Sequence, residues 1–171
     1  IAITHSASQA DRAGADFGFA LARLLGARPF LLPDHKRSLY HAAAAFACNY
    51  LVTLEHHAEA LFVDSGLPRE QALSLFLPLV RATLDNIADQ GPVRALTGPL
   101  SRGDTGTVGR HLEALRADAP HLLGVYRVLG LATLELLRLR GEVDPPVVDE
   151  LSSLLSASDE TPGPRSDGPG A

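Results

Sequence analysis

The chain has 171 residues, of which 46% are hydrophobic and 20% charged, and its net charge is −5 at pH 7. This composition is typical of a globular protein and excludes a disordered chain. Because nucleic acids bind basic protein surfaces, the negative net charge argues against a nucleic-acid partner. Cys48 is the only cysteine, so no intrachain disulfide and no cysteine-based zinc site can form, and a reducing cytoplasm is the simplest compartment. No apolar run reaches the roughly 20 residues that cross a bilayer, so no membrane partner is expected.

The start of the chain predicts a strand, a helix and a second strand. IAIT, at residues 1–4, is typical of a short buried strand, and Ser6 or Ser8 is placed to cap the following helix. Gly26 ends that helix, and RPFLLP at residues 28–33 predicts a second strand, after a crossover long enough for parallel pairing. Because two strands alone do not make a stable sheet, we expect this piece to be the edge of a sheet whose other strands are absent from this chain or are supplied by another copy.

From Asp34, a candidate helix cap, the pattern becomes helical, and glycines or prolines punctuate each junction. The predicted helices cover residues 34–65, 68–88, 104–115, 120–140 and 145–155. The last stretch lacks large apolar side chains, which predicts a disordered tail. The sequence therefore predicts a mainly α-helical protein with three parts. These are a β-α-β piece at residues 1–33, a helical domain at 34–156 and the tail at 157–171.

Polar side chains interrupt the apolar pattern in YHAAAAFACNYL, at residues 40–51. At about 100° per residue, a histidine and an asparagine share one stripe of the helix with small side chains. The stripe holds His41, Ala45, Cys48, Asn49, Val52 and His56. Two interpretations stay open. Either His41 and Asn49 hydrogen-bond to backbone inside a tightly packed bundle, or they hold, or exchange a proton with, a substrate oxygen, since imidazole titrates near neutrality.

A second polar segment is the loop ALTGPLSRGDTGTV, at residues 95–108. Asp104 or Thr105 can cap the next helix, and free backbone N–H groups there, with Arg102 beside them, would suit a carboxylate or phosphate. The alternative is ordinary turn chemistry in which Arg102 pairs with Asp104. The loop is not a P-loop, because Asp104 and Thr105 stand where lysine and serine or threonine belong. Nor does it follow a strand, as a dinucleotide fingerprint must.

Other chemistries find weaker support in the residues. His56 and Glu59 lie three apart on one helix face, but no matching pair occurs on a second helix, so no metal site is predicted. A hydrolase is not predicted either, because the chain has no GxSxG elbow and Ser101 does not follow a strand.

The two polar segments together resemble a known family. YHAAAAFACNYLVTLEHHAEAL and the later NIADQGPVRALTGPLSRGDTGTVGRHLEAL are similar to the carboxyl-terminal domain called domain of unknown function 2520. In its family, that domain follows a Rossmann-like domain in proteins grouped with oxidoreductases. The resemblance runs over about residues 1–140. The family's usual serine before Asn49 is Cys48 here, which weakens any role for a hydroxyl at that position and leaves Asn49 untouched.

The resemblance implies a helical bundle of the type at the carboxyl end of 6-phosphogluconate dehydrogenase, preceded here by a short β-α-β remnant of a Rossmann-like domain. In such relatives the bundle builds the dimer interface and closes the substrate pocket against the nicotinamide. Matched residue by residue, it points to His41 and Asn49 as catalytic residues. By analogy with pyrroline-carboxylate reductases, it points to Thr97, Arg102 and Asp104 as substrate-binding residues.

The function implied is that of the substrate-binding and dimerisation half of an NADP-dependent oxidoreductase. Its substrate would be a small carbonyl or imine acid, and its partner a second copy of the chain in the cytoplasm. NADP would bind to a domain missing from this chain, because no residue here forms the glycine fingerprint. The alternative is a non-catalytic helical dimerisation or interaction module, in which residues 42–45 form a helix-packing seam.

Overall fold

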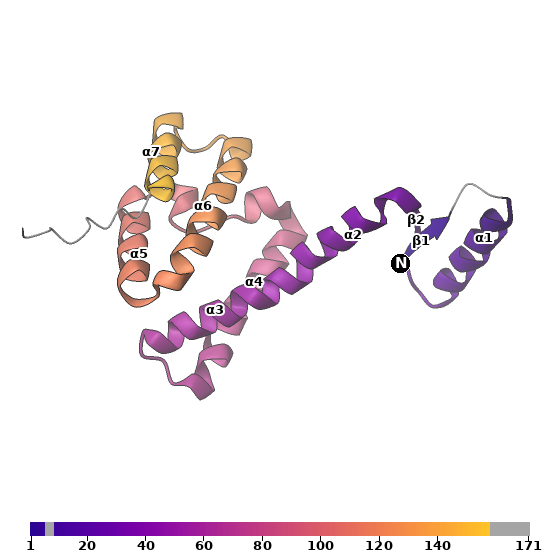
Figure 1. Cartoon of the computed structure of the whole chain (residues 1–171), viewed down its shortest axis with the longest axis horizontal. Helices are drawn as coiled ribbons and strands as arrows, with labels where there is room; N and C mark the ends of the chain where they lie inside the picture. Colours follow the sequence, from indigo (N-terminus) through magenta and orange to yellow (C-terminus); the bar gives the residue numbers. More distant parts are fainter. Residues whose placement is uncertain (6–8, 158–171) are drawn as a thin grey trace, which may run out of the picture. The chain divides into compact units, whose positions relative to one another are not determined.

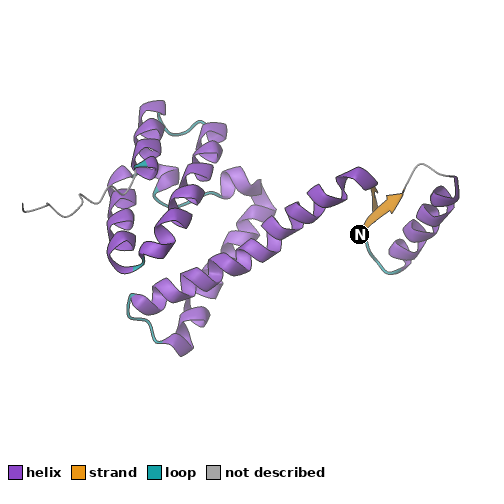
Figure 2. Cartoon of the chain, in the orientation of Figure 1, coloured by secondary structure: helices purple, strands orange, loops and turns teal. Residues whose placement is uncertain are grey.

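The computed structural model of the chain describes residues 1–5 and 9–157. It is mainly helical, with a small parallel sheet near the amino end, as predicted (Figure 1, Figure 2). The chain divides into two compact units, Ile1–Ala58 and Glu59–Ala171. The division falls inside a helix, and the predicted domain boundary after residue 33 stays a prediction. Apart from Ala157, the predicted tail lies outside the described residues.

The first unit begins with the predicted strand, helix and strand. The elements are β1 (Ala2–His5), α1 (Gln9–Leu24) and β2 (Phe30–Pro33). The strands pair in parallel, with Ala2 opposite Phe30. Gly26 has φ 74°, a left-handed conformation that lets the chain turn after α1. The candidate caps Ser6 and Ser8 lie outside the described residues.

One long helical rod follows, but it is not the regular helix predicted for residues 34–65. Its parts are the 3₁₀ turn η1 (Asp34–Lys36), α2 (Arg37–Ala44), the π turn η2 (Ala45–Asn49) and α3 (Tyr50–Asp64). In the π turn the Tyr50 N–H donates to the Ala45 carbonyl, five residues back instead of four. Asp34 does not cap the rod. Its Oδ1 accepts a hydrogen bond from the Arg37 guanidinium, at 2.6 Å, within the first turn.

The second unit contains the end of α3 and the remaining helices. They are α4 (Arg69–Ala95), the 3₁₀ turn η3 (Leu100–Arg102), α5 (Thr105–Asp118), α6 (Pro120–Arg140) and α7 (Pro145–Ser156). The sequence ended the first of these too early, at Ala88. Gly91, with φ 78° and ψ 163°, breaks the helical backbone, and Pro92 then opens a further short turn. Near the start of α4, the ring of Phe76 stacks on Phe62 from α3, with centroids 5.0 Å apart.

The hydrophobic core lies where α5, α6 and α7 pack against one another (Figure 1). Its largest fully buried side chains are Val108, Leu134, Leu137, Leu151 and Leu155. Gly130 lets α6 approach α7 closely, because a Cβ there would lie 2.7 Å from Cδ2 of Leu155. None of the helices within residues 1–5 and 9–157 is long and apolar enough to cross a membrane.

Candidate functional site

The predicted catalytic residues lie on the rod of the first unit. His41 is in α2, and Asn49 is the last residue of the π turn; both side chains are exposed. A π turn holds more residues than an α turn, so each residue advances by roughly 80° instead of 100°. This turns Asn49 towards the line through His41 and Ala45, and turns Cys48 away from it. Cys48 therefore does not lie on the same face as His41, Ala45 and Asn49. The predicted stripe included it because the prediction assumed a regular α-helix.

The spacing of His41 and Asn49 limits what they can do together. They are eight residues apart, which is at most about 12 Å along the axis at 1.5 Å per residue. Two side chains this far apart reach the two ends of a small molecule and not one oxygen atom. Neither side chain hydrogen-bonds to any residue in the described part of the chain, so the interpretation as internally bonded bundle residues gains no support from a single copy.

Aromatic rings flank these two residues along the rod. The Tyr40 ring lies 6.0 Å from the His41 ring and 5.8 Å from Phe30 of β2, centroid to centroid. Further along, Phe46 and Tyr50 meet edge to face at 5.0 Å. The surroundings of His41 and Asn49 are therefore exposed, apolar and aromatic.

In the second unit, Asp104 caps α5, as one of the two predicted alternatives had it. Its Oδ1 accepts a hydrogen bond from the Thr107 N–H at 2.9 Å, and its Oδ2 accepts one from the Thr107 hydroxyl at 2.7 Å. These two bonds lower the pKa of Asp104, and the charges of Arg110 and Arg102 lower it further. A carboxylate of the protein itself thus occupies the start of this helix, where a bound anion was one of the predicted possibilities.

The other two loop residues are accessible. Thr97 and Arg102 are exposed, and Arg102 is in no ion pair with a residue that the structure describes. Arg102 nevertheless lies near enough to Asp104 to affect its pKa through space. The second unit therefore brings Arg102 and Asp104 together, while His41 and Asn49 belong to the first unit. The catalytic and substrate-binding roles of all five residues stay predictions.

Residues from the end of α6 and the start of α7 support the loop, and sequence reasoning missed them. Arg140 donates from Nη1 to the Leu96 carbonyl at 3.0 Å and from Nε to Oε2 of Glu142 at 2.5 Å. At the far end of the loop, Gly103 packs so closely that a Cβ there would lie 2.9 Å from Val147 Cγ1 and 3.2 Å from Val143 Cγ1. Such contacts between distant parts of the chain leave no local sequence signal.

Within residues 1–5 and 9–157, no three histidine, cysteine, aspartate or glutamate side chains gather as a metal ion would require. The sequence between β1 and α1, from His5 to Gln9, contains no glycine, whereas a dinucleotide fingerprint is rich in glycine. The binding of NADP to a further domain stays a prediction.

Comparison with known proteins gives one match. The family described as a domain of unknown function (DUF2520) matches residues 4–133, which include the rod, α4, the loop and most of α6. No curated protein and no solved structure matches the chain. The match covers well over half of the chain and contains both polar segments, so the chain belongs to the DUF2520 family.

Proposed function

We propose that this chain is the substrate-binding and self-associating part of an NADP-dependent oxidoreductase, acting on a small carbonyl or imine acid as a cytoplasmic homodimer. The family resemblance supports the class of reaction. The observation that carries the self-association is the rod, which combines His41 and Asn49 with large exposed apolar side chains.

The rod exposes large apolar side chains over residues 39–54. Six of them occur between residues 39 and 54: Leu39, Tyr40, Phe46, Tyr50, Val52 and Leu54, with exposed fractions of 65, 39, 73, 52, 70 and 37%. Together these six expose roughly 700 Å², spread over several sides of the rod. The main neighbours of α2 are η1 and η2, which adjoin it in sequence. Within the first unit this surface therefore has no helix to cover it.

A second copy of the chain is the occupant that we propose for this surface. A stable interface buries about 800 Å² on each partner, and the apolar side chains on one face of the rod, with the alanines at 42–45, would contribute part of that area. The small alanines would let the two rods approach closely. Because His41 and Asn49 lie on the same rod, the substrate site would then be built at the contact between two copies.

The oligomeric state of the chain tests this proposal directly. We expect sedimentation equilibrium to show a dimer, and Phe46→Glu to weaken it at least about tenfold by placing a charge in a desolvated contact. Leu139→Glu is the matched control, because Leu139 is 74% exposed on α6 and belongs to the second unit, and it should leave the dimer unchanged. A wild-type chain that stays monomeric at about 100 µM overturns the proposal, since such a dimer would then be weaker than a specific one.

Cys48 gives an independent measure of the same contact. It is the only thiol of the chain and is exposed on the rod of a single copy. We expect its reaction with a thiol reagent to slow as the protein concentration passes the dissociation constant of the dimer. In a Cys48→Ala background, a cysteine placed at the exposed Ser74 of α4 should react at one rate over the same range of concentration.

Nucleotide binding separates the oxidoreductase from the second candidate function, a non-catalytic dimerisation module. The capping bonds of Asp104 favour that candidate, because they explain the presence of this residue in the loop without a substrate. This chain alone should not bind NADPH, whereas the full-length polypeptide that contains it should bind NADPH and oxidise it with a 2-oxo or imine acid. His41→Ala and Asn49→Ala should abolish that turnover while the dimer persists. Failure of the full-length polypeptide to bind NADPH would leave only the module.

A further inference from the structure

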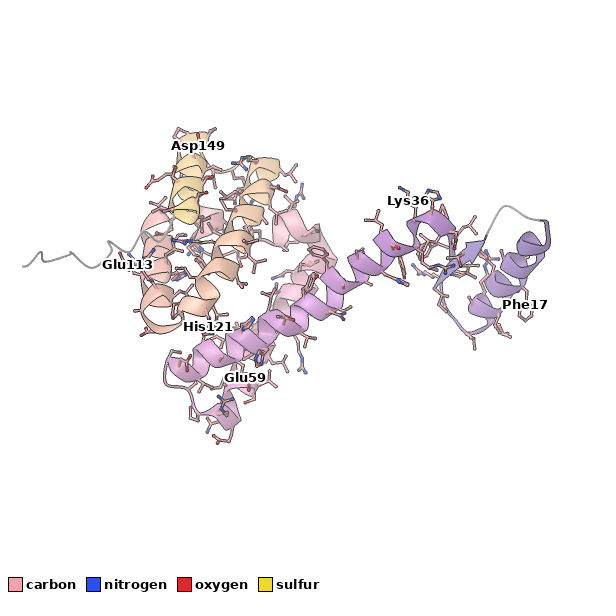
Figure 3. The ribbon with its side chains drawn as sticks, in the orientation of Figure 1. Phe17, Lys36, Glu59, Glu113, His121 and Asp149 are labelled. Atoms are coloured by element: carbon pink, nitrogen blue, oxygen red, sulfur yellow. The ribbon has the colours of Figure 1, made fainter. Side chains whose placement is uncertain are left out.

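A cleft of about 300 Å³ lies at the corner where α6 ends and α7 begins. Its lining includes Leu137, Arg138, Val143, Pro145, Val148 and Asp149, all within the second unit (Figure 3 labels Asp149 on α7). The volume is at the lower end of the range for small-molecule sites, about 300–1,000 Å³. It suits a metabolite of about ten non-hydrogen atoms and not a larger ligand.

The floor of the cleft is apolar and held rigidly by the core. Leu137 and Val148 are 2% and 4% exposed, and both belong to the core cluster of α5, α6 and α7. Val143 and Pro145 continue this apolar surface across the turn between the two helices. A ligand here would place a hydrocarbon part against a surface that the fold keeps in one shape.

The rim carries one cation and one anion that do not neutralise each other. Arg138 comes from α6 and Asp149 from α7, both are exposed, and neither side chain pairs with any residue that the structure describes. The neighbouring pair of Arg140 and Glu142 shows that charges at this corner do pair where geometry permits.

We propose that this cleft binds a small zwitterion with an aliphatic body. Its carboxylate would pair with Arg138, its ammonium group with Asp149, and its hydrocarbon part would lie on Val143 and Val148. Two sources share this chemistry. They are α-amino acids such as leucine, with adjacent charges, and ω-amino acids, with charges at opposite ends.

Binding here would also reach the predicted substrate loop. Val143 lines the cleft, and the same side chain packs against Gly103, where a Cβ would lie 3.2 Å from its Cγ1. A ligand that moves Val143 therefore changes the support of the loop. The cleft is separate from the five predicted site residues, and its occupancy can be measured whether or not the chain belongs to an oxidoreductase.

Titration followed by amide NMR tests the proposal on the intact chain. L-leucine and 6-aminohexanoate are the two zwitterionic probes, and the one that fits the charge spacing should shift the amides of Val143, Val148 and Gly103 at millimolar concentration. The matched single-charge probes are 4-methylpentanoate and 3-methylbutylamine, which should bind at least about tenfold more weakly because one rim charge stays unpaired.

Variants on the rim complete the test. Arg138→Gln and Asp149→Asn, at exposed positions, should each weaken binding at least about tenfold without unfolding the chain. Arg81→Gln and Asp85→Asn, on an exposed stretch of α4, are the controls and should leave it unchanged. The proposal is wrong if neither zwitterion shifts these amides at concentrations up to about 10 mM. The dissociation constant would then be too high for a specific site. The proposal is also wrong if the single-charge probes bind equally well, or if binding survives both rim variants.

Discussion

Asp104 caps α5 and is also one of the predicted substrate-binding residues of the loop. Its two oxygens are both engaged by Thr107, so its carboxylate holds the first turn of α5 in place. That a cap would lie here could be predicted, since capping depends on residues three positions apart. Whether the helix start also receives an outside anion could not, because this depends on how Arg102 and the rest of the loop are held in space.

The acid sensitivity of the fold should depend on Asp104. A lowered pKa in the folded state means that the ionised carboxylate stabilises the fold at pH values above about 4, its usual range. That stability is lost as the pH falls through the lowered pKa. Asp104→Asn keeps one capping acceptor and removes the titration, so it should melt at a lower temperature at pH 7 and lose less stability towards about pH 3. Thermal melts across this range check it, and parallel curves for the two proteins would contradict it.

Two glycines of α6 should respond to alanine with opposite signs. At Gly130 a Cβ would lie 2.7 and 3.0 Å from the methyl carbons of Leu155, which is 1% exposed and has little room to move. Overpacking costs about 1–3 kcal/mol and outweighs the roughly 1 kcal/mol that alanine adds in a helix. Gly130→Ala should therefore destabilise the fold by about 1 kcal/mol, while Gly124→Ala, with no atom within 4 Å of its Cβ, should stabilise it. Urea unfolding measures both, and the same sign for both would refute the packing argument.

Helix bounds differ in how far the sequence predicts them. The bounds of α6 are the predicted ones, because Pro120 opens it and Gly141 closes it in a left-handed conformation. The π turn of the rod could not be predicted. An extra residue in one turn can be detected in a sequence only where it shifts a regular apolar pattern. The rod, with exposed apolar residues on several sides, has none. The partners of the loop were also out of reach, because Arg140 and Leu96 are 44 residues apart.

The end of α6 should control the order of the loop. Arg140→Ala removes the bond to the Leu96 carbonyl, so we expect a loss of about 1–2 kcal/mol and faster hydrogen exchange in the loop, from residue 97 to residue 104. Glu142→Gln is the control. This variant disrupts only the ion pair between Glu142 and Arg140. Because the Glu142 side chain is 60% exposed, the free energy of unfolding and the loop exchange should change little. Unchanged loop exchange in Arg140→Ala would show that Val143 and Val147 are sufficient to hold the loop.

The two units differ in how much each can stabilise itself. Among residues 1–4 and 14–58, Ala22 is the only buried apolar residue of the first unit, while the second holds the cluster of α5, α6 and α7. The sequence predicted the elements of both units but not this imbalance, because apolar residues look alike in a pattern whether they are buried within the chain or exposed for a partner.

Hydrogen exchange of the whole chain should show this imbalance. Amides of α6 and α7 should be protected longest, since they exchange only when the core opens. Amides of α2 should exchange fast in dilute solution and become protected as the concentration rises, because a second copy then covers the rod. Protection of α2 equal to that of α7 at every concentration would show that the rod is stable by itself.

The π turn at Ala45–Asn49 also bears on how this family is to be aligned. A π turn holds one residue more than an α turn, and such turns inside α-helices are frequent at functional sites. Deleting a single codon within the turn should therefore leave a continuous helix. It would, however, swing the face bearing His41 by about 100° relative to everything after Asn49. Members of the family that have a regular helix here should show a one-residue gap at this point, and with it a differently oriented histidine.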